Sequence, residues 1–218
     1  METFDAGRLD PRFWVVTAEG DFREQRVDVV DVARRNPRDH RLRVRLDTRD
    51  TRDDTVKFLG VRSTAPIRLA RRARVDVQID WNDQANGSYL TAGVLLAPKA
   101  TEGNPLRTAN WLKVEYVGVP PGRNARLLVT ASVEGRERQL HDEGWPKVNR
   151  EGRRIAVQNL TILLRGPSFE VWENDRLACR AARAVLPFEG AHLYLQVSSH
   201  GNYPTREVFF DEIRVSAP

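Results

Sequence analysis

The strongest constraint on the fold is an alternation of apolar and polar residues with a period of two. The segment Leu42 to Asp47 places leucine and valine on one face and arginine and aspartate on the other. The segment Arg74 to Trp81 repeats this pattern with valine, isoleucine and tryptophan against aspartate and glutamine. Because successive side chains of a β-strand point to opposite faces, the pattern predicts strands with one buried face.

The alternation continues along most of the chain. Further candidate strands are Val27 to Val32, Val56 to Val61, Leu90 to Leu96, Trp111 to Val117, Arg126 to Val133, Ile155 to Leu164, Phe169 to Glu173, Leu193 to Ser199 and Val208 to Val215. Turn-forming residues separate several of them, at Asn86-Gly87, Pro120 to Gly122, Arg165 to Pro167 and Glu173 to Asp175. The alanine-rich stretch Leu177 to Val185 is either a short helix or a strand followed by a loop.

Strands of this number and length are too many for one open sheet. No run of polar, proline-rich or glycine-rich residues divides the chain, and 218 residues lie within the usual range of one β-sandwich. We therefore expect a single all-β domain over residues 1–218, built as a sandwich or barrel.

The charged residues are numerous but mixed in sign. Arginine supplies 31 of the 35 basic residues, and it alternates with 30 acidic residues, as in Arg49 to Asp54. The net charge of +5 is therefore not gathered into one basic face, and we do not expect a nucleic-acid partner. This composition predicts surface ion-pair networks of the kind common in thermostable proteins.

The chain as written begins without a basic segment followed by an apolar stretch, and no apolar run approaches the roughly 18 residues that span a bilayer. We expect a cytoplasmic protein without a membrane partner, or a secreted one if the sequence is a mature fragment. The only cysteine, Cys179, cannot form an internal disulfide, which agrees with a reducing compartment. The oligomeric state is left open.

Five segments, taken in order, resemble the concanavalin A-like lectin/glucanase superfamily: TFDAGRLDPRFW, RVDVQIDW, LTAGVLLAP, WLKVEYVG and VFFDEIRV. The run from Asp83 to Gly135 is similar to cytosolic members with no assigned reaction. The resemblance implies a two-sheet antiparallel jelly-roll sandwich with a concave face for ligands. It implies little about function, because this fold hosts lectins, glycosidases, lyases and adhesive modules.

Laminarinase-type members of the superfamily carry Glu-x-Asp-x-Glu on one strand, and the best match here is Asp76 to Asp80. The match departs from the pattern because Gln78 cannot transfer protons. Asp76 and Asp80 would lie about 13 Å apart at ~3.3 Å per residue, which is too far for the ~5 Å pair of a retaining enzyme. The catalytic residues of that family are therefore not transferred to this chain.

The polar faces of three strands are nevertheless a candidate binding groove. Outward positions of Trp111 to Val117 and of Leu193 to His200 add amide, carboxylate and indole groups to those of Arg74 to Trp81. If these strands are neighbours, the groove is lined by Asp76, Gln78, Asp80, Trp111, Lys113, Glu115, Gln196 and His200. Trp111 would then be the plate on which a sugar ring stacks, although Trp111 and Trp81 are equally explained as core or rim aromatics.

Two segments are candidate functional loops. His141 to Pro146 combines an imidazole, two carboxylates and an indole, and Ser198 to Arg206 adds a second imidazole beside Tyr203. A histidine, tyrosine and arginine set suits proton abstraction by a polysaccharide lyase. If the protein is an enzyme, the candidate catalytic residues are Glu115, His200 and Tyr203.

The resemblance also implies a structural calcium ion that joins the first and last strands. Asp211 in VFFDEIRV occupies the matching position, with Asp5 or Asp31 as a partner from the N-terminal side. Calcium prefers six to eight oxygen ligands, so one aspartate does not define a site. No other cofactor is required.

Three functions from different classes follow. The first is a non-catalytic module that binds a glycan or another partner through the concave face. The second is a glycoside hydrolase or polysaccharide lyase on the same face, and the third is an assembly domain whose sheet meets another protein. A close carboxylate pair would favour hydrolysis, a tryptophan-floored groove would favour binding, and a flat apolar patch would favour a protein partner.

Overall fold

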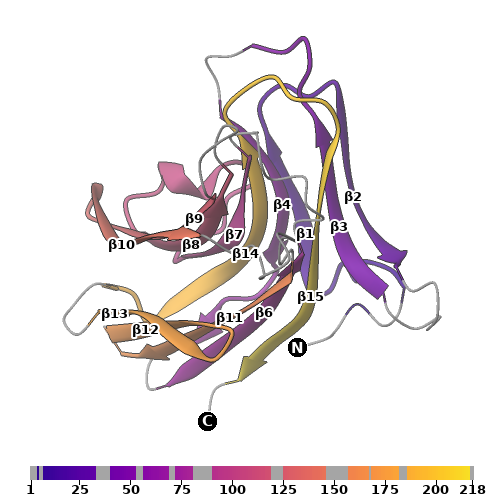
Figure 1. The fold of residues 1–218 in the computed structure, drawn as a ribbon. Coiled ribbons are helices and arrows are strands. Elements are labelled where there is room, and N and C mark those ends of the chain that lie inside the picture. Colours follow the sequence, from indigo (N-terminus) through magenta and orange to yellow (C-terminus); the bar gives the residue numbers. More distant parts are fainter. Residues whose placement is uncertain are drawn as a thin grey trace, which may run out of the picture.

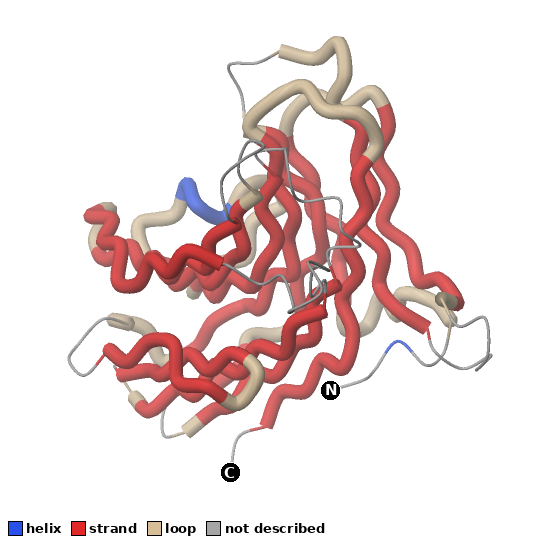
Figure 2. Tube along the Cα trace, viewed as in Figure 1, coloured by secondary structure: helices blue, strands red, loops and turns tan. Residues whose placement is uncertain are grey.

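The computed structural model describes residues 4, 7–32, 40–52, 56–68, 72–80, 90–118, 125–145, 157–166, 168–181 and 186–216. Most of this chain is extended (Figure 2). The strands are β1 (Trp14–Glu19), β2 (Glu24–Asp31), β3 (His40–Asp47), β4 (Lys57–Ser63), β5 (Ile67–Arg68), β6 (Ala73–Asp80), β7 (Leu90–Ala97), β8 (Trp111–Val117), β9 (Ala125–Val133), β10 (Arg136–Trp145), β11 (Val157–Arg165), β12 (Ser168–Glu173), β13 (Arg176–Ala181), β14 (Gly190–Ser199) and β15 (Arg206–Ser216). A short 3-10 helix, η2 (Pro105–Arg107), lies between β7 and β8.

The strands form two antiparallel sheets that pack face to face (Figure 1). Sheet A has the order β1-β4-β14-β7-β8-β9-β10, with β5 attached to β14, and sheet B has the order β13-β12-β11-β6-β15-β3-β2. Some neighbours are far apart in sequence, as β14 is from β4 and β7, whereas others, such as β7 and β8, are consecutive strands. The predicted two-sheet jelly-roll sandwich is confirmed.

The core between the sheets is built from the apolar positions of the alternating segments. On β6, Val77 and Ile79 are 2% and 0% exposed, whereas Gln78 between them faces outwards and is only partly buried. On β3, Leu42 and Val44 are likewise buried, and Arg43 between them is not. The predicted register of these two strands is therefore confirmed.

The structure differs from the sequence prediction at residues 136–145, of which 141–145 belong to the predicted first loop: they form the edge strand β10. For the stretch Leu177 to Val185, the strand alternative is correct at its beginning, because Arg176–Ala181 forms β13. Asn174 and Asp175 both have positive φ (47° and 64°), which is the two-residue geometry that returns a strand directly as a hairpin.

Several predicted features lie outside the described residues. These are the turns at Asn86-Gly87 and Pro120 to Gly122, Trp81, Asp5, Pro146 and residues 182–185. Among the helices of the described part of the chain, none is long and apolar enough to cross a membrane.

Candidate functional site

The residues predicted to line one groove lie on two different sheets. Asp76, Gln78 and Asp80 face outwards from β6, which pairs with β11 and β15 in sheet B. Trp111, Lys113 and Glu115 on β8 and Gln196 on β14 belong to sheet A. The prediction of one continuous groove is therefore wrong. Alternation identifies the face of a strand that points outwards, but it does not tell which sheet the strand joins.

The three β6 side chains are fully engaged with protein neighbours. Asp76 accepts a hydrogen bond of 2.7 Å from Arg74 and another from Thr161, and these lower the pKa of its carboxyl although burial opposes them. Asp80 pairs with Arg41 at 3.2 Å, and the Gln78 amide donates to the Asn159 side chain at 3.1 Å. These contacts assign the residues to the surface of sheet B rather than to a ligand.

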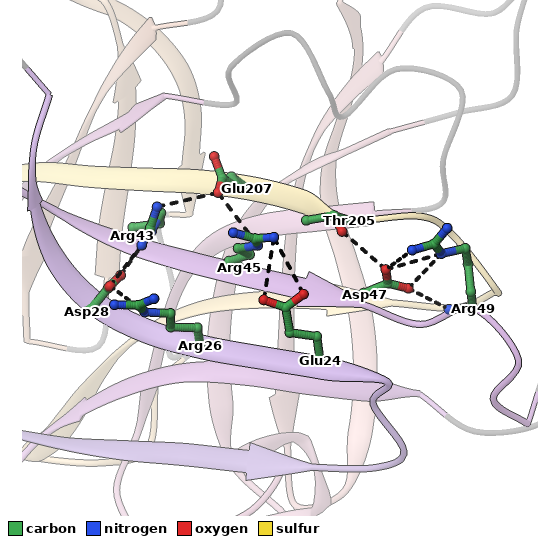
Figure 3. A network of polar contacts seen from close by, with 9 residues as sticks. All are labelled: Glu24, Arg26, Asp28, Arg43, Arg45, Asp47, Arg49, Thr205 and Glu207. Carbon is green, nitrogen blue, oxygen red and sulfur yellow. Dashed lines mark hydrogen bonds and ion pairs between the residues drawn. The ribbon is translucent and has the colours of Figure 1, made fainter.

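The rest of the outer face of sheet B continues this pattern (Figure 3). Arg43 lies between Asp28, at 2.8 Å, and Glu207, at 3.6 Å. Glu207 also contacts Arg45 at 3.8 Å, so that β2, β3 and β15 are joined through their side chains. The predicted ion-pair networks are therefore present. Such networks favour retention of structure at high temperature, although single exposed pairs contribute little.

Asp211, the residue predicted to bind calcium, also belongs to this face. Its carboxylate lies 3.4 Å from Arg41 Nε and accepts a hydrogen bond of 2.7 Å from the Glu212 amide. Among the described residues, no group of three or more acidic, histidine or cysteine side chains is suitably placed to hold a metal ion. The residues around Asp211 therefore do not fit a calcium ion, because a guanidinium occupies the side where a cation would lie.

The outer face of sheet A is partly covered by residues 98–110, the connection between β7 and β8, which we call the strap. Its Thr101 amide donates to the Tyr194 hydroxyl at 2.9 Å, and that hydroxyl donates to the Lys99 carbonyl at 3.2 Å. Leu106 packs on a second apolar cluster of this face, formed by Phe58, Leu95, Ala97, Trp111 and Tyr194. The strap and η2 lie on the side of sheet A away from sheet B (Figures 1 and 2).

Trp111 faces outwards as predicted, but it is not an exposed plate. Only 1% of it is accessible, because the strap covers it, and its indole N–H donates to the Leu106 carbonyl at 3.3 Å. The other aromatic side chains of the second cluster, Phe58 and Tyr194, are at most 1% exposed. The predicted role of Trp111 as a stacking platform is therefore wrong for this conformation.

Beyond the strap, Lys113 and Glu115 form an ion pair on β8. Lys113 Nζ lies 2.7 Å from a Glu115 carboxylate oxygen, and the side chains are 15% and 6% exposed. The ammonium also lies 5.8 Å from the centre of the Trp111 ring. The positions directly across from Glu115 are Gly93 on β7 and Leu128 on β9, so neither neighbour supplies a second carboxylate.

Gln196 lies at the centre of β14, between two glycines that have no side chain to cover it. Its partner positions are Gly60 on β4 and Gly93 on β7. A Cβ atom at Gly60 would lie 2.0 Å from the Leu195 carbonyl oxygen, and one at Gly93 would lie 2.2 Å from that of Val114. Gln196 is 1% exposed, and its Oε1 has no hydrogen-bond partner. A buried acceptor in this state costs free energy unless something else satisfies it.

Ser198 on β14 and His200, which directly follows the end of that strand, continue the polar surface. The Ser198 hydroxyl shares a hydrogen bond of 2.6 Å with Thr91 on β7. Desolvation lowers the pKa of the His200 imidazole, the charge of Glu115 opposes this, and the charges of Lys113 and Lys57 reinforce it. The ring is therefore mostly neutral at neutral pH.

Tyr203 is not brought to this group. Its backbone N–H and C=O bond to Thr48, at 3.0 Å each, and its ring lies against Gly201. No contact among the described residues joins its hydroxyl to Glu115 or His200. Among the described residues, no hydrogen bond or ion pair joins Glu115, His200 and Tyr203 to one another, so the structure does not assemble the predicted catalytic set.

In the first predicted loop segment, His141 to Pro146, two side chains face the other sheet. His141 and Glu143 lie on β10 opposite Val129 and Leu127, which are core residues, and so they face sheet B. There Glu143 accepts a hydrogen bond of 2.7 Å from Arg176 of β13. This contact lowers the pKa of the Glu143 carboxyl. The segment therefore ties the two sheets together and does not join Ser198 to Arg206.

Sequence reasoning missed the strap and the two strand glycines as determinants of this face. A glycine inside a strand pattern marks a close backbone approach, and Gly93 within LTAGVLLA carried that signal. The strap carried none, because Thr101 to Arg107 reads as an ordinary polar loop.

No protein-family model matches the chain, and no curated protein is similar to it in sequence. Solved structures are similar in fold. A functionally unknown protein from Saccharomyces cerevisiae has 14% identity and a TM-score of 0.56, over 98% of this chain and 97% of that one. The carbohydrate binding module CBM66 from Bacillus subtilis has 13% identity and a TM-score of 0.54, over 94% and 95%.

The catalytic domain of an endo-1,3-beta-glucanase (laminarinase) from Thermotoga petrophila has 13% identity and a TM-score of 0.65, over 98% of this chain and 94% of that one. Identities this low describe the fold and not the reaction. Together with the strand order of the two sheets, these similarities show that the chain shares the two-sheet jelly-roll fold of these structures.

Proposed function

We propose that the part of the outer face of sheet A that lies beyond the strap binds a neutral oligosaccharide without chemically changing it. We call this part the polar floor, and it consists of Thr91, Lys113, Glu115, Gln196 and Ser198. The observation that carries the proposal is Gln196 Oε1, a buried acceptor without a partner between two positions that tolerate only glycine. A sugar hydroxyl is a donor of the size and polarity that would satisfy it.

The charge of the floor favours a neutral ligand. Lys113 and Glu115 neutralise each other, and on the adjoining strands Arg126 donates to Asp142 at 2.6 Å. Each pair still presents donors and acceptors side by side, which suits the vicinal hydroxyls of a sugar. Two of the solved structures similar in fold are named as a carbohydrate binding module and a 1,3-beta-glucanase, which supports the choice of ligand class.

We expect the affinity to be modest. Stacking of a sugar on an aromatic ring contributes on the order of 1 kcal/mol beyond burial, and Phe58, Trp111 and Tyr194 are covered by the strap. Hydrogen bonds and the desolvation of a small polar area then remain as the main sources of binding energy.

Titration calorimetry with β-1,3-glucan, β-1,4-glucan and alginate oligosaccharides tests the proposal. Gln196→Met keeps the length of the side chain and removes the unsatisfied amide, so it should weaken binding at least about fivefold while the melting temperature is unchanged or raised. Gln78→Met, on the outer face of sheet B, is the matched control and should bind as the unmodified protein does. Absence of binding to every oligosaccharide, or equal binding by Gln196→Met, would contradict the proposal.

A second candidate is β-elimination of a uronate-containing polysaccharide. The specific observation in its favour is the position of His200 directly after β14, the strand of Gln196, together with its lowered pKa, since a neutral imidazole can accept the proton α to a carboxylate. Lys113 would then neutralise that carboxylate. Incubation with alginate should generate unsaturated ends that absorb in the ultraviolet, and His200→Gln should abolish them. A blank assay leaves binding as the only function proposed.

A further inference from the structure

The strap closes the polar floor on one side. Besides its contacts with Tyr194 on β14 and Trp111 on β8, it reaches the edge strand β1, where the Asn104 amide donates to a Glu19 carboxylate oxygen at 2.9 Å. Arg107 of η2 pairs with the same carboxylate. The strap therefore lies across β14, β4 and β1 from one side of sheet A.

Burial along one row of paired positions shows the effect. The row runs Thr17, Gly60, Gln196, Gly93, Glu115, Leu128 and Asp142 from β1 to β10. Thr17 is only 1% exposed although β1 is an edge strand, and Gln196 is also 1% exposed. Leu128 is half-buried and Asp142 is exposed at the opposite end. The row is thus buried from β1 to β8 and becomes accessible at β9 and β10.

Polar atoms without partners gather at the closed end. Thr17 Oγ1 and Gln196 Oε1 stand on either side of Gly60 in this row, and both are buried without a hydrogen bond. Arg62 Nε, two residues along β4 on the same face, is a third such atom. An acceptor amide, a hydroxyl and a guanidinium N–H around a position without a side chain match a group that carries several hydroxyls.

We propose that the site recognises the end of an oligosaccharide chain rather than its interior, which rests on the proposed glycan binding. The terminal unit lies over Gly60 and Gly93 and exchanges hydrogen bonds with Gln196 and Thr17. The strap is the wall against which the chain ends. The following units extend over Leu128 towards Asp142, where the sheet is open. A chain passing through would have to cross the strap, whose contacts with β1 and β14 hold it in place.

Stoichiometry on a long soluble β-1,3-glucan distinguishes the two modes. If only ends are recognised, the number of protein molecules bound per chain stays at one as the chain is lengthened, and the affinity per mole of chain levels off at short oligomers. Modification of the recognised end should weaken binding roughly tenfold, or about 1.4 kcal/mol, and modification of the other end should have less than about a twofold effect. Reduction to the alditol and oxidation of the non-reducing unit supply these two ligands.

The Thr17→Val variant tests the closed end itself. It replaces a hydroxyl without a partner by a methyl group of similar size, so it should weaken binding about threefold or more without lowering the melting temperature. Several proteins per chain, or equal loss from modification of either end, would overturn end recognition and leave glycan binding intact. Unchanged binding by Thr17→Val would mean that ordered water, and not the sugar, is the hydrogen-bond partner of the Thr17 hydroxyl. This result would also overturn end recognition. Absence of binding to any glucan refutes both proposals.

Discussion

A hydrogen bond between Tyr116 and Glu173 crosses the core and gives the sharpest stability prediction. Tyr116 on β8 of sheet A is 0% exposed, and its hydroxyl donates to Glu173 Oε1 of β12 in sheet B at 2.9 Å. Glu173 is itself 2% exposed, with Arg176 3.6 Å from its second oxygen. Burial, and then the nearby Glu173 charge, raise the pKa of the Tyr116 hydroxyl well above its ordinary range, so it remains a donor at every practical pH.

Tyr116→Phe removes one oxygen atom and leaves the ring in place. A hydrogen bond to a charged group contributes about 1.5–3 kcal/mol, and a buried carboxylate that loses one retains its desolvation penalty. We therefore expect the free energy of unfolding to fall by about 2 kcal/mol. For a chain of 218 residues this corresponds to roughly 4–8 °C in melting temperature.

Urea denaturation followed by tryptophan fluorescence measures the change in the free energy of unfolding. The slope of this free energy against urea concentration should be the same in the variant and the unmodified protein. Glu173→Gln and the double variant complete a thermodynamic cycle. Because the two side chains are in direct contact, their effects should be non-additive by about 1–2 kcal/mol. A loss below about 0.5 kcal/mol for Tyr116→Phe, or strict additivity in the cycle, would refute the assignment of this bond as a stabilising link between the sheets.

Other predictions concern the strands and carboxylates described above. Val77→Asp should unfold the protein, because it buries an unpaired charge at a cost of several kcal/mol, whereas Gln78→Ala should change the melting temperature little; equal melts would disprove the β6 register. The lowered pKa of Glu143 means that its contribution to stability is present above the unfolded value of ~4.3 and is lost as pH falls through the folded value. Glu143→Gln should therefore be less stable at pH ~7 by up to about 1 kcal/mol, and the difference should vanish in acid. Asp211→Asn should lower the melting temperature by the same amount with and without a chelator. If a chelator lowers the melting temperature of the unmodified protein but not that of the variant, the calcium hypothesis is restored.

The sequence was sufficient for the fold because alternation reports the burial of each strand directly. The predicted strand Trp111 to Val117 coincides with β8, and the predicted turn at Glu173 to Asp175 is the β12–β13 hairpin. The edge strand β10 was missed for a physical reason. It exposes polar side chains on both faces, so RERQLHDEGW lacks the apolar period. In β13, the alanines left a helix as an alternative to the strand.

The candidate site was less predictable because it depends on long-range contacts. Nothing local in RVDVQIDW and WLKVEYVG says that these strands enter different sheets, yet that choice separates Gln78 from Glu115. Gln196 illustrates the second difficulty. Its lack of a partner results from glycines on β4 and β7 that are more than one hundred residues from it in sequence. A pattern within one strand can therefore indicate an outward-facing amide, but only the packed sheet shows whether that amide has been left for a ligand.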